Sequence, residues 1–273
     1  MTTTQFPVDI SAWIGAYPFR EIPHPDPGIL VRVLERELIS RAWVGSLPSV
    51  WHRNPGPSNA WLYQQLAPFA DVLLPSPTIR PDWPGWEQAL DEAVSRGAPS
   101  VRLYPMQLGV GSDARLLSSA ARACGERGLV VQLTVRFEDF RQRHRLDEVG
   151  DLTAAHIRTV VRGDPRVHVI VSGAGRDMIE ETHWSLTPDE QRRCFWDWAW
   201  VWGPPEDHFA HLISTVGADR FVFGGFWPLR LIQAPVATFS LLQAFLPGLT
   251  TSSGDDVQRA SRQAAGLRAR SSP

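Results

Sequence analysis

Short apolar runs rich in β-branched and aromatic residues alternate with helix-like stretches along the chain. This alternation is typical of a parallel sheet whose strands are joined by helical crossovers. The expected strands are 7–14, 41–47, 71–77, 99–104, 129–136, 166–172, 195–201 and 219–224. Eight strands are the number that closes a barrel, so the sequence predicts a single α/β domain with the (β/α)8 TIM-barrel fold.

Helices are expected between these strands, where the apolar spacing changes to the helical period. Their expected ranges are 27–39, 58–69, 84–97, 113–127, 150–163, 176–183 or a later start near 188, 205–216 and 235–245. The stretch 113–127 has the clearest ends, because Ser112 or Asp113 can cap its start and Gly128 can terminate it.

The end of the chain predicts one further helix, over 255–268, which would close the barrel and leave 269–273 frayed. We find no internal repeat and no low-complexity linker, so residues 1–273 are expected to form one domain. A doubly wound open sheet is the main alternative. It would ordinarily carry a phosphate loop after the first strand, but WIGAYPFR has neither GxGxxG nor GxxxxGK spacing, which favours the barrel.

Length and composition limit the classes of function. The 273 residues suit a barrel, which typically takes about 250 residues. A formal net charge of -2 gives no electrostatic reason to expect nucleic acid or an anionic membrane as a partner. Cys124 and Cys194 lie far apart and outside any CxxC spacing, which favours a reducing compartment over a disulfide framework. Without a signal-like start or a run of roughly 20 apolar residues, a cytoplasmic protein is expected.

Three stretches carry landmarks of one known family: VDISAWIG (8–15), SVRLYP (100–105) and GADRFVFGGFWPLR (217–230). They resemble, in order, a first strand with Asp-x-His-x-His, a fourth-strand Gly-Val-Lys-Leu-x-Pro segment, and an eighth-strand Gly-Ala-Asp-Arg-x-x-Phe-Gly-Ser/Thr-Asp-x-Pro segment. A weaker likeness is QAAGLRAR (263–270), with Gln263 where the family often has Asn. The chain thus resembles the amidohydrolase-related TIM barrels, a group that includes decarboxylases of the aminocarboxymuconate type.

The same resemblance locates the family's metal site. That site takes two histidines of the first strand, one histidine from each of the fifth and sixth strands, and the eighth-strand aspartate. Here these places hold Ser11, Trp13, a residue near Thr134, a residue near Gly173, and Phe226. Zinc is bound by imidazole, thiolate or carboxylate groups, which none of these residues supplies. We therefore expect no metal and no other cofactor.

Two other histidines have a spacing that can chelate a metal. His208 and His211 stand three residues apart on an expected helix, with Glu206 and Asp207 just before them. The alternative is an ordinary solvated helix start, where acidic residues favour the helix dipole. His168 alternates within an apolar strand and is expected to be a core or outward-facing histidine.

The strongest local signal for function is RFEDFRQRH, which leaves the end of the fifth strand, on the face where barrel active sites are built. Glu138 and Asp139 are candidate bases and His144 a candidate proton carrier, while Arg136 and Arg141 are candidate ligand-binding residues. The alternative is a loop whose ion pairs only hold the barrel rim together.

Strand residues add to this picture. If Asp9, Arg102, Tyr104 and Arg136 converge, an arginine–carboxylate network has replaced the metal, which is a sensible way to fill a cavity that lost a dication. We therefore count Asp9, Arg102 and Tyr104 among the ligand-binding candidates. An Arg102 or Arg136 side chain aimed at solvent on the helical outside would contradict this hypothesis.

In the run FWDWAWVWG (195–203), every second residue from 196 to 202 is a tryptophan. Read as a strand, it places Trp196, Trp198, Trp200 and Trp202 on one face and Asp197 on the other. The indoles would fill the layer between strand and helices, or else form an aromatic wall for a planar or cationic ligand. A buried Asp197, our last ligand-binding candidate, should pair with an arginine or a backbone amide. At the end of the last expected strand, Gly224 and Gly225 suggest a phosphate site, but Pro228 interrupts the helix start that such a site would use.

Three functions are compatible with these residues. The first is an amidohydrolase-like barrel without its metal that binds a small anionic or aromatic molecule at the carboxyl ends of the strands. The second is a metal-independent hydrolase or carbon–carbon lyase of the decarboxylase kind, with Glu138 or Asp139 as base, His144 as proton carrier, and Arg102 or Arg136 holding a carboxylate. The third is a non-catalytic subunit paired with a metal-bearing homologue. Whichever function holds, a homodimer is the expected oligomeric state. Whether the protein is an enzyme stays open.

Overall fold

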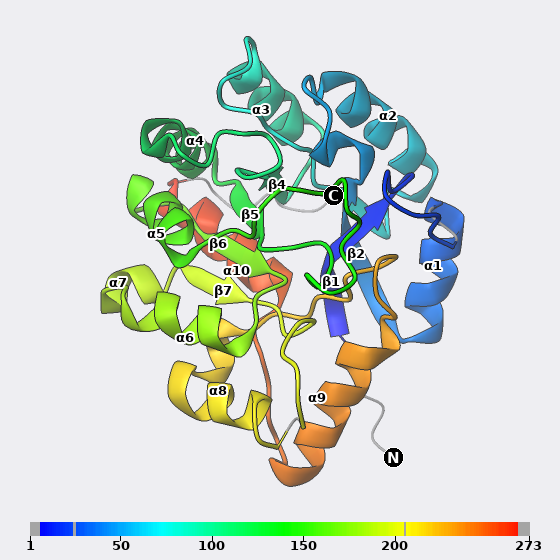
Figure 1. Ribbon diagram of the computed structural model, residues 1–273, viewed down its shortest axis with the longest axis vertical. Helices are drawn as coiled ribbons and strands as arrows, with labels where there is room; N and C mark the ends of the chain where they lie inside the picture. Colours follow the sequence, from blue (N-terminus) through cyan, green and yellow to red (C-terminus); the bar gives the residue numbers. More distant parts are fainter. Residues whose placement is uncertain (1–5, 24–25, 205, 267–273) are drawn as a thin grey trace.

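The computed structural model describes residues 6–23, 26–204 and 206–266. Its strands are β1 (Phe6–Ile14), β2 (Ile39–Ser46), β3 (Leu73–Pro75), β4 (Ser100–Leu103), β5 (Val130–Thr134), β6 (Val169–Ser172) and β7 (Cys194–Trp196). All pairings are parallel, in the order β1-β2-β3 and β4-β5-β6-β7. Helices surround these strands on the outside, as the prediction of a TIM barrel requires (Figure 1).

Backbone hydrogen bonds join the two sheets on one side through residues just after β3. Arg102 N donates to Pro77 O at 2.8 Å, and Ile79 N donates to Arg102 O at 3.0 Å. These bonds continue the parallel pairing beyond the end of β3. The strand predicted at 71–77 is therefore shorter than expected, but its continuation still borders β4.

The strand expected at 219–224 is reduced to a few bridging residues. Val222 N donates to Trp196 O at 2.9 Å, and Ile10 N donates to Phe223 O at 3.0 Å, so residues 221–223 connect β7 to β1. The first part of the expected strand instead belongs to the 3-10 helix η3 (Ala218–Arg220), which is formed by local turn hydrogen bonds. The eighth strand is thus present as a connection, shorter than predicted.

The predicted helices are all found, with ends displaced by a few residues. They are α1 (Pro27–Arg36), α2 (Gly56–Leu66), α3 (Trp86–Ser95), α4 (Ala114–Arg127), α5 (Ala154–Gly163), α6 (Arg176–Trp184), α7 (Pro188–Gln191), α8 (Phe209–Val216), α9 (Gln233–Phe245) and α10 (Gly254–Ala264), with short 3-10 helices η1 (Pro48–Val50) and η2 (Ala67–Phe69). The predicted range 205–216 is observed from Phe209, and residue 205 lies outside the described residues. Over the described ranges, no helix combines the length and hydropathy needed to cross a membrane.

The ends of α4 show why the local sequence predicts helices well. The Asp113 side chain accepts hydrogen bonds from the Arg115 and Leu116 amides, and Gly128 ends the helix at a φ of +63°. Glycine adopts that left-handed conformation at little cost, and Asp is a preferred N-cap residue. Both ends were expected, and both are confirmed.

The terminal helix α10 covers the amino-terminal end of the barrel. It contributes Val257 to a buried apolar cluster with Val8, Ile10, Trp43, Val130, Ile170, Phe195 and Val222. A Cβ on Gly254 would lie 2.7 Å from Ile10 Cγ2, so only glycine allows the helix this close. Arg41 of β2 forms an ion pair with Asp255. The predicted helix is confirmed up to Ala264, and Ala265 and Gly266 form a turn after it. The last predicted helix residues, 267–268, and the end expected to fray, 269–273, lie outside the described residues.

The strand predicted at 195–201 ends much earlier, at Trp196. Asp197 accepts a hydrogen bond from the Ala199 amide, two residues on, and this turn ends the strand. The tryptophans therefore do not share one strand face. Trp198 is buried and donates through Nε1 to Pro235 O at 3.0 Å, whereas Trp202 is 50% exposed. The prediction of a single aromatic face is wrong for this reason.

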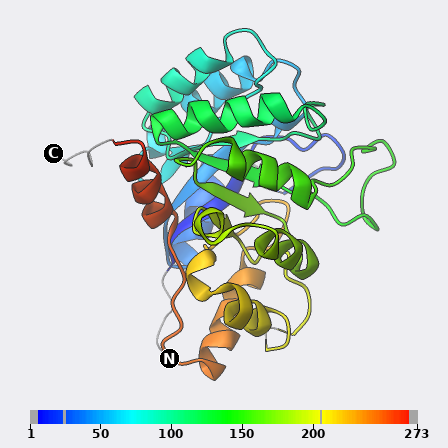
Figure 2. The same ribbon diagram turned by 90° about the vertical axis from the view of Figure 1, so that its left-hand side faces the viewer.

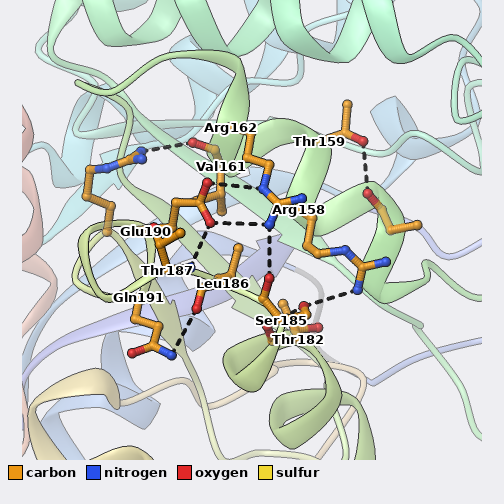
Figure 3. Close-up of polar contacts among 12 residues, drawn as sticks. Arg158, Thr159, Val161, Arg162, Thr182, Ser185, Leu186, Thr187, Glu190 and Gln191 are labelled. Atoms are coloured by element: carbon orange, nitrogen blue, oxygen red, sulfur yellow. Dashed lines mark hydrogen bonds and ion pairs between the residues drawn. The ribbon is translucent and has the colours of Figure 1, made fainter.

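A polar layer on the outside ties α5 to the α6–α7 segment (Figure 3). Arg162 donates to Glu190 Oε1 at 3.0 Å and to Ser185 O at 2.9 Å, and Arg158 donates to Ser185 Oγ at 3.1 Å. These side chains belong to helices and helix ends on the barrel's outside. Their role is to attach the short α7 to the barrel.

Figure 2 shows α10 and the loop that follows β5 on opposite sides of the molecule. Since α10 covers the amino-terminal end, the loops after the strands gather at the other end, which we call the mouth. Barrel enzymes build their active sites there. The assignment of residues 1–273 to one domain stays a prediction.

Candidate ligand site at the barrel mouth

A register irregularity in β1 creates the polar interior beneath the mouth. The pairing of β1 with β2 shifts between Asp9 and Ala12. In this stretch the Ile10 and Ala12 carbonyl oxygens lie 3.2 and 3.1 Å from Arg102 Nη2, and the Trp43 oxygen lies 3.0 Å from it. Buried carbonyls need donors, so the Arg102 guanidinium satisfies the groups that the irregularity leaves unpaired.

Gln132 of β5 is a second interior donor, which we did not identify from the sequence. Its Nε2 donates to Ile10 O at 2.6 Å, while its Oε1 accepts from Ser76 Oγ at 2.8 Å. Ser100 Oγ lies 2.8 Å from Ser76 Oγ. The sequence signal for this residue was a single glutamine within an apolar strand. A buried side-chain amide requires hydrogen-bond partners, so its presence indicates a polar interior.

Arg102 also stacks on an aromatic ring. Its guanidinium carbon lies 4.3 Å from the centroid of Trp13, and Trp13 Nε1 donates to the Tyr104 hydroxyl at 3.0 Å. Burial lowers the pKa of Arg102 and raises the pKa of Tyr104. Both side chains are buried inside the barrel, as expected.

Asp9 is fully buried at the edge of this interior. Its Oδ1 accepts hydrogen bonds from Gly225 N at 2.8 Å and Ser11 N at 2.9 Å, while Oδ2 has no partner. Burial raises its pKa to about 6, against the lowering effect of these amides and of Arg102. A Cβ on Gly225 would lie 2.5 Å from Asp9 Oδ2, so the backbone approach requires glycine.

Asp197, just after β7, is the second fully buried carboxyl group. Its Oδ1 accepts from Ala199 N at 3.2 Å and Gly173 N at 3.4 Å, so it pairs with backbone amides as expected. Burial raises its pKa to about 7, and the negative charge of Asp9 acts in the same direction. A group with this pKa holds its proton for much of the time at neutral pH.

Aromatic rings cover these groups on the mouth side. The Trp13 ring lies 4.9 Å from Phe226 and 5.8 Å from Phe137, and Phe226 lies 5.7 Å from Trp200, all in tilted or edge-on contacts. The four rings are buried. We call them the aromatic floor of the mouth.

The carboxylates of the loop after β5 are held in ion pairs. Glu138 Oε1 lies 2.6 Å from Arg20 Nε, and Asp139 Oδ1 lies 2.8 Å from Arg141 Nε. Hydrogen bonds from Arg141 lower the pKa of Asp139 to about 2. The segment RFEDFRQRH therefore has the ion pairs of the alternative interpretation, in which the loop only holds the barrel rim together.

Arg136 and His144 lie apart from the interior network. Arg136 Nη2 is 2.8 Å from Asp151 Oδ2 within the same loop, so Arg136 does not join the other three residues of the hypothesised network. That part of the hypothesis is corrected, because Asp151 offers a nearer carboxylate. His144 is exposed and stacks on Phe19 at 5.8 Å.

The helical histidines do not form a chelate. His211 Nε2 lies 2.6 Å from Glu180 Oε1 of α6, while the His208 ring packs against Gly203. In the described ranges, no group of three or more His, Cys, Asp or Glu side chains is arranged to hold a metal ion.

Arg230 is the rim residue that sequence reasoning missed. Its guanidinium carbon lies 4.8 Å from the Trp200 ring and 4.3 Å from the Trp202 ring. Burial lowers its pKa, and its Nη1 has no hydrogen-bond partner. Within the described part of the chain, no carboxylate forms an ion pair with it, although the charges of Asp197 and Asp139 act on it. We call Arg230 with these two tryptophans the arginine clamp.

No protein-family model and no curated protein sequence matches this chain. Solved structures do resemble it. A 2,6-dihydroxybenzoate decarboxylase from Rhizobium has a TM-score of 0.62 at 14% identity, covering 96% of this chain and 99% of that one. A dihydroxybenzoic acid decarboxylase from Polaromonas sp. JS666, with bound manganese and the inhibitor 2-nitroresorcinol, has a TM-score of 0.63 at 13% identity, covering 97% and 98%.

An amidohydrolase from Mycobacterium avium subsp. paratuberculosis K-10 has a TM-score of 0.59 at 16% identity, covering 90% of this chain and 75% of that one. Similarity at such identities is a similarity of fold. The chain therefore has the TIM-barrel fold of the amidohydrolase-related proteins, as the sequence landmarks predicted. Function depends on the site, which the fold does not determine.

Proposed function

We propose that this protein binds a small aromatic carboxylate at the rim of the barrel mouth, through the arginine clamp and without a resident metal ion. One observation carries the proposal: a half-buried guanidinium is held between two indole rings and has no carboxylate partner among the described residues. Such a group supplies a fixed positive charge and two hydrogen-bonding edges to an incoming carboxylate.

The contrast with neighbouring arginines supports this role. Arg20, Arg136 and Arg141 each form an ion pair with a carboxylate of the loop after β5, which largely neutralises their charges. Arg230 is held by aromatic rings instead, which fix its position without neutralising it. The half-exposed Trp202 offers a ring face beside it, which suits an aromatic acid.

The residues at the family's metal positions do not fit a transition metal. Trp13 and Phe226 present aromatic rings and Gly173 has no side chain, while Ser11 Oγ already accepts a hydrogen bond from Phe226 N at 3.2 Å. Neutral hydroxyls such as those of Ser11 and Thr134 are poor substitutes for imidazole or carboxylate ligands. We accordingly propose binding that requires no metal.

A second candidate is metal-independent decarboxylation of the bound acid, and Asp197 favours it. Burial raises the pKa of this carboxyl group to about 7, so it can carry a proton at neutral pH, and its charge acts on Arg230. In this reaction the ring carbon takes the Asp197 proton, the bond between ring and carboxylate breaks, and carbon dioxide leaves. Because Asp197 lies beneath the aromatic floor, the reaction requires the Trp200 or Phe226 ring to move aside so that the acid reaches the carboxyl group. Glu138 and Asp139, being ion-paired, would then position the rim loop, not act as bases.

Calorimetric titration in chelator-treated buffer tests the proposal, with 2,6-dihydroxybenzoate as ligand and resorcinol as the analogue without the carboxylate. We expect saturable binding of the acid, weaker binding of resorcinol, and at least about a tenfold loss of affinity in Arg230→Gln. Arg141→Gln is the matched control, because it removes a paired rim arginine and should leave affinity unchanged.

Equal binding of resorcinol and the acid, or unchanged affinity in Arg230→Gln, would contradict the proposed site. Loss of binding on chelation, together with near-stoichiometric zinc or manganese in the untreated protein, would contradict metal independence. Release of carbon dioxide from the bound acid, abolished in Asp197→Asn with binding retained, would establish the second candidate.

A further inference from the structure

A separate cleft lies in the loop between β3 and α3. It measures about 410 Å³ and is formed by residues 81–88, with Trp83 and Trp86 half-buried at its wall. Small-molecule pockets usually fall between about 300 and 1,000 Å³, so the cleft has room for a small ligand. Figure 1 shows α3 and α9 at opposite edges of the barrel, which separates this cleft from Arg230 just before α9.

The loop that forms the cleft is held in shape by its own contacts. Arg80 and Asp82 form a two-pronged ion pair, with Nε–Oδ1 at 2.8 Å and Nη2–Oδ2 at 2.9 Å. Trp86 N donates to Trp83 O at 3.3 Å, and Gly85 takes the left-handed φ of +83° that this turn requires. The backbone turn that carries the two tryptophans is thus held in one conformation, which lowers the entropic cost of binding.

The charge of the lining favours one class of ligand. Asp82 and Glu87 line the cleft, and no lysine, arginine or histidine does. Asp82 is partly neutralised by Arg80, whereas Glu87 is exposed and forms no ion pair with any described residue. Among the lining residues, the charge without an ion-pair partner in the described ranges is thus that of Glu87, which favours a cation over an anion beside it.

One internal contact already shows a cation on this aromatic wall. The guanidinium carbon of Arg53, from the loop between β2 and α2, lies 5.9 Å from the centroid of Trp83. This is within the range at which a positive charge interacts with the face of an indole ring, and tryptophan is the ring that binds cations best. Arg53 is itself exposed, so this contact leaves the cleft open to solvent.

We propose that the Trp83–Trp86 cleft binds a small organic cation, such as a quaternary ammonium group, beside its indole rings and the Glu87 carboxylate. A cleft with room for a small ligand, two tryptophans in its wall and a carboxylate without an ion pair are features that suit such cations. This site is independent of the arginine clamp, because the two take ligands of opposite charge.

Choline chloride is the probe, and 3,3-dimethyl-1-butanol is its neutral analogue of the same shape. Titration of the full chain, followed by protein NMR shifts, should give saturable choline binding and at least about fivefold weaker binding of the alcohol. Trp83→Ala and Glu87→Gln should each weaken choline binding severalfold. Trp184→Ala is the matched control, because Trp184 is 62% exposed on α6, outside the cleft, and should leave choline affinity unchanged.

Glu87→Gln changes one exposed side chain, so it keeps the test valid even if Trp83→Ala fails to fold. Absence of saturable choline binding, equal affinity for the neutral alcohol, or unchanged affinity in Glu87→Gln would each overturn the proposal. Arg230→Gln should leave choline binding intact, and a loss there would place the cation at the mouth and overturn it as well.

Discussion

The interior beneath the aromatic floor and the loop after β5 both hold carboxylates and arginines, but in opposite environments. In the interior, Asp9 and Asp197 accept hydrogen bonds from backbone amides, and Arg102 donates to carbonyls. On the rim, Asp139 pairs directly with Arg141. Burial dominates inside and raises both pKa values, to about 6 and about 7, whereas pairing dominates outside and lowers the pKa of Asp139 to about 2.

This difference separates two uses of charged residues. Interior groups satisfy backbone atoms of β1 and of the segments after β6 and β7, so they hold these strand ends together at the mouth. On the rim, Asp139 is little exposed and also accepts the Arg141 amide, but its ion-pair partner Arg141 is 69% exposed. An ion pair with so exposed a partner contributes little to stability. Stability should therefore depend strongly on the interior and weakly on the rim.

The largest effect is expected from Arg102→Met. This change removes the guanidinium that donates to the buried Ala12 and Trp43 carbonyls, and leaves Ile10 O with Gln132 alone. It should lower the free energy of unfolding by about 3 kcal/mol or more. Urea denaturation followed by circular dichroism measures it. A loss below about 1 kcal/mol would show that the guanidinium is dispensable and that the comparison is mistaken.

A smaller loss is expected from Gly225→Ala. The new Cβ would lie 2.5 Å from Asp9 Oδ2 and 2.7 Å from Ile232 Cγ1, so the segment after residue 223 must shift, at a cost of about 2 kcal/mol. Gly150→Ala is the matched control, since its Cβ would meet only Met106 Cε at 3.8 Å. Equal urea midpoints for the two variants would argue against the tight packing of Asp9.

The dependence of stability on pH should follow the interior groups. Because the folded pKa values of Asp9 and Asp197 exceed the ordinary value of 3.8, the folded state binds protons more tightly than the unfolded state. Their stabilising contribution is full below about pH 4 and is lost as the pH rises through about 6 to 7. We expect a free energy of unfolding at least about 1 kcal/mol lower near pH 8 than near pH 5.

The variant Asp9→Asn/Asp197→Asn supplies the check on that prediction. Without these carboxyl groups the difference between the two pH values should shrink, and an undiminished difference would assign it to other groups. The contribution of Asp139 to stability changes with pH in the opposite direction. Because its folded pKa is lowered, this contribution is present at neutral pH and is lost only as the pH falls towards about 2.

The smallest effect is expected from Asp139→Asn. The paired Arg141 is largely exposed, and solvent screens the interaction, so the urea midpoint at neutral pH should stay unchanged within error. A clear drop would show that the rim loop contributes to folding, and the contrast between the two regions would then disappear.

Much of the fold could be predicted because its signals are local. Helix caps such as Asp113 and Gly128, and the alternation of apolar runs, depend on neighbouring residues. The strand ends near Trp196 and at 221–223 could not be read in this way. They depend on a side chain that turns back on its own backbone and on hydrogen bonds to distant strands.

The site shows the same division. Asp9, Arg102 and Tyr104 were recognisable as inward-facing strand residues, and they do lie close together in the interior. Arg230 was not, because its surroundings are made by Trp200 and Trp202, which come from a different loop. Nothing in the residues next to an arginine shows which rings will pack against it.

The arginine clamp also gives the protein an optical signature. The Trp200 and Trp202 rings lie 5.7 Å apart and nearly perpendicular, at 86°, with the guanidinium beside both. Two indoles held so close in a fixed, chiral arrangement couple their electronic transitions and should produce a paired circular dichroism band. A molecule that draws the cation away from the rings would alter this band, so occupancy of the rim could be followed without a label.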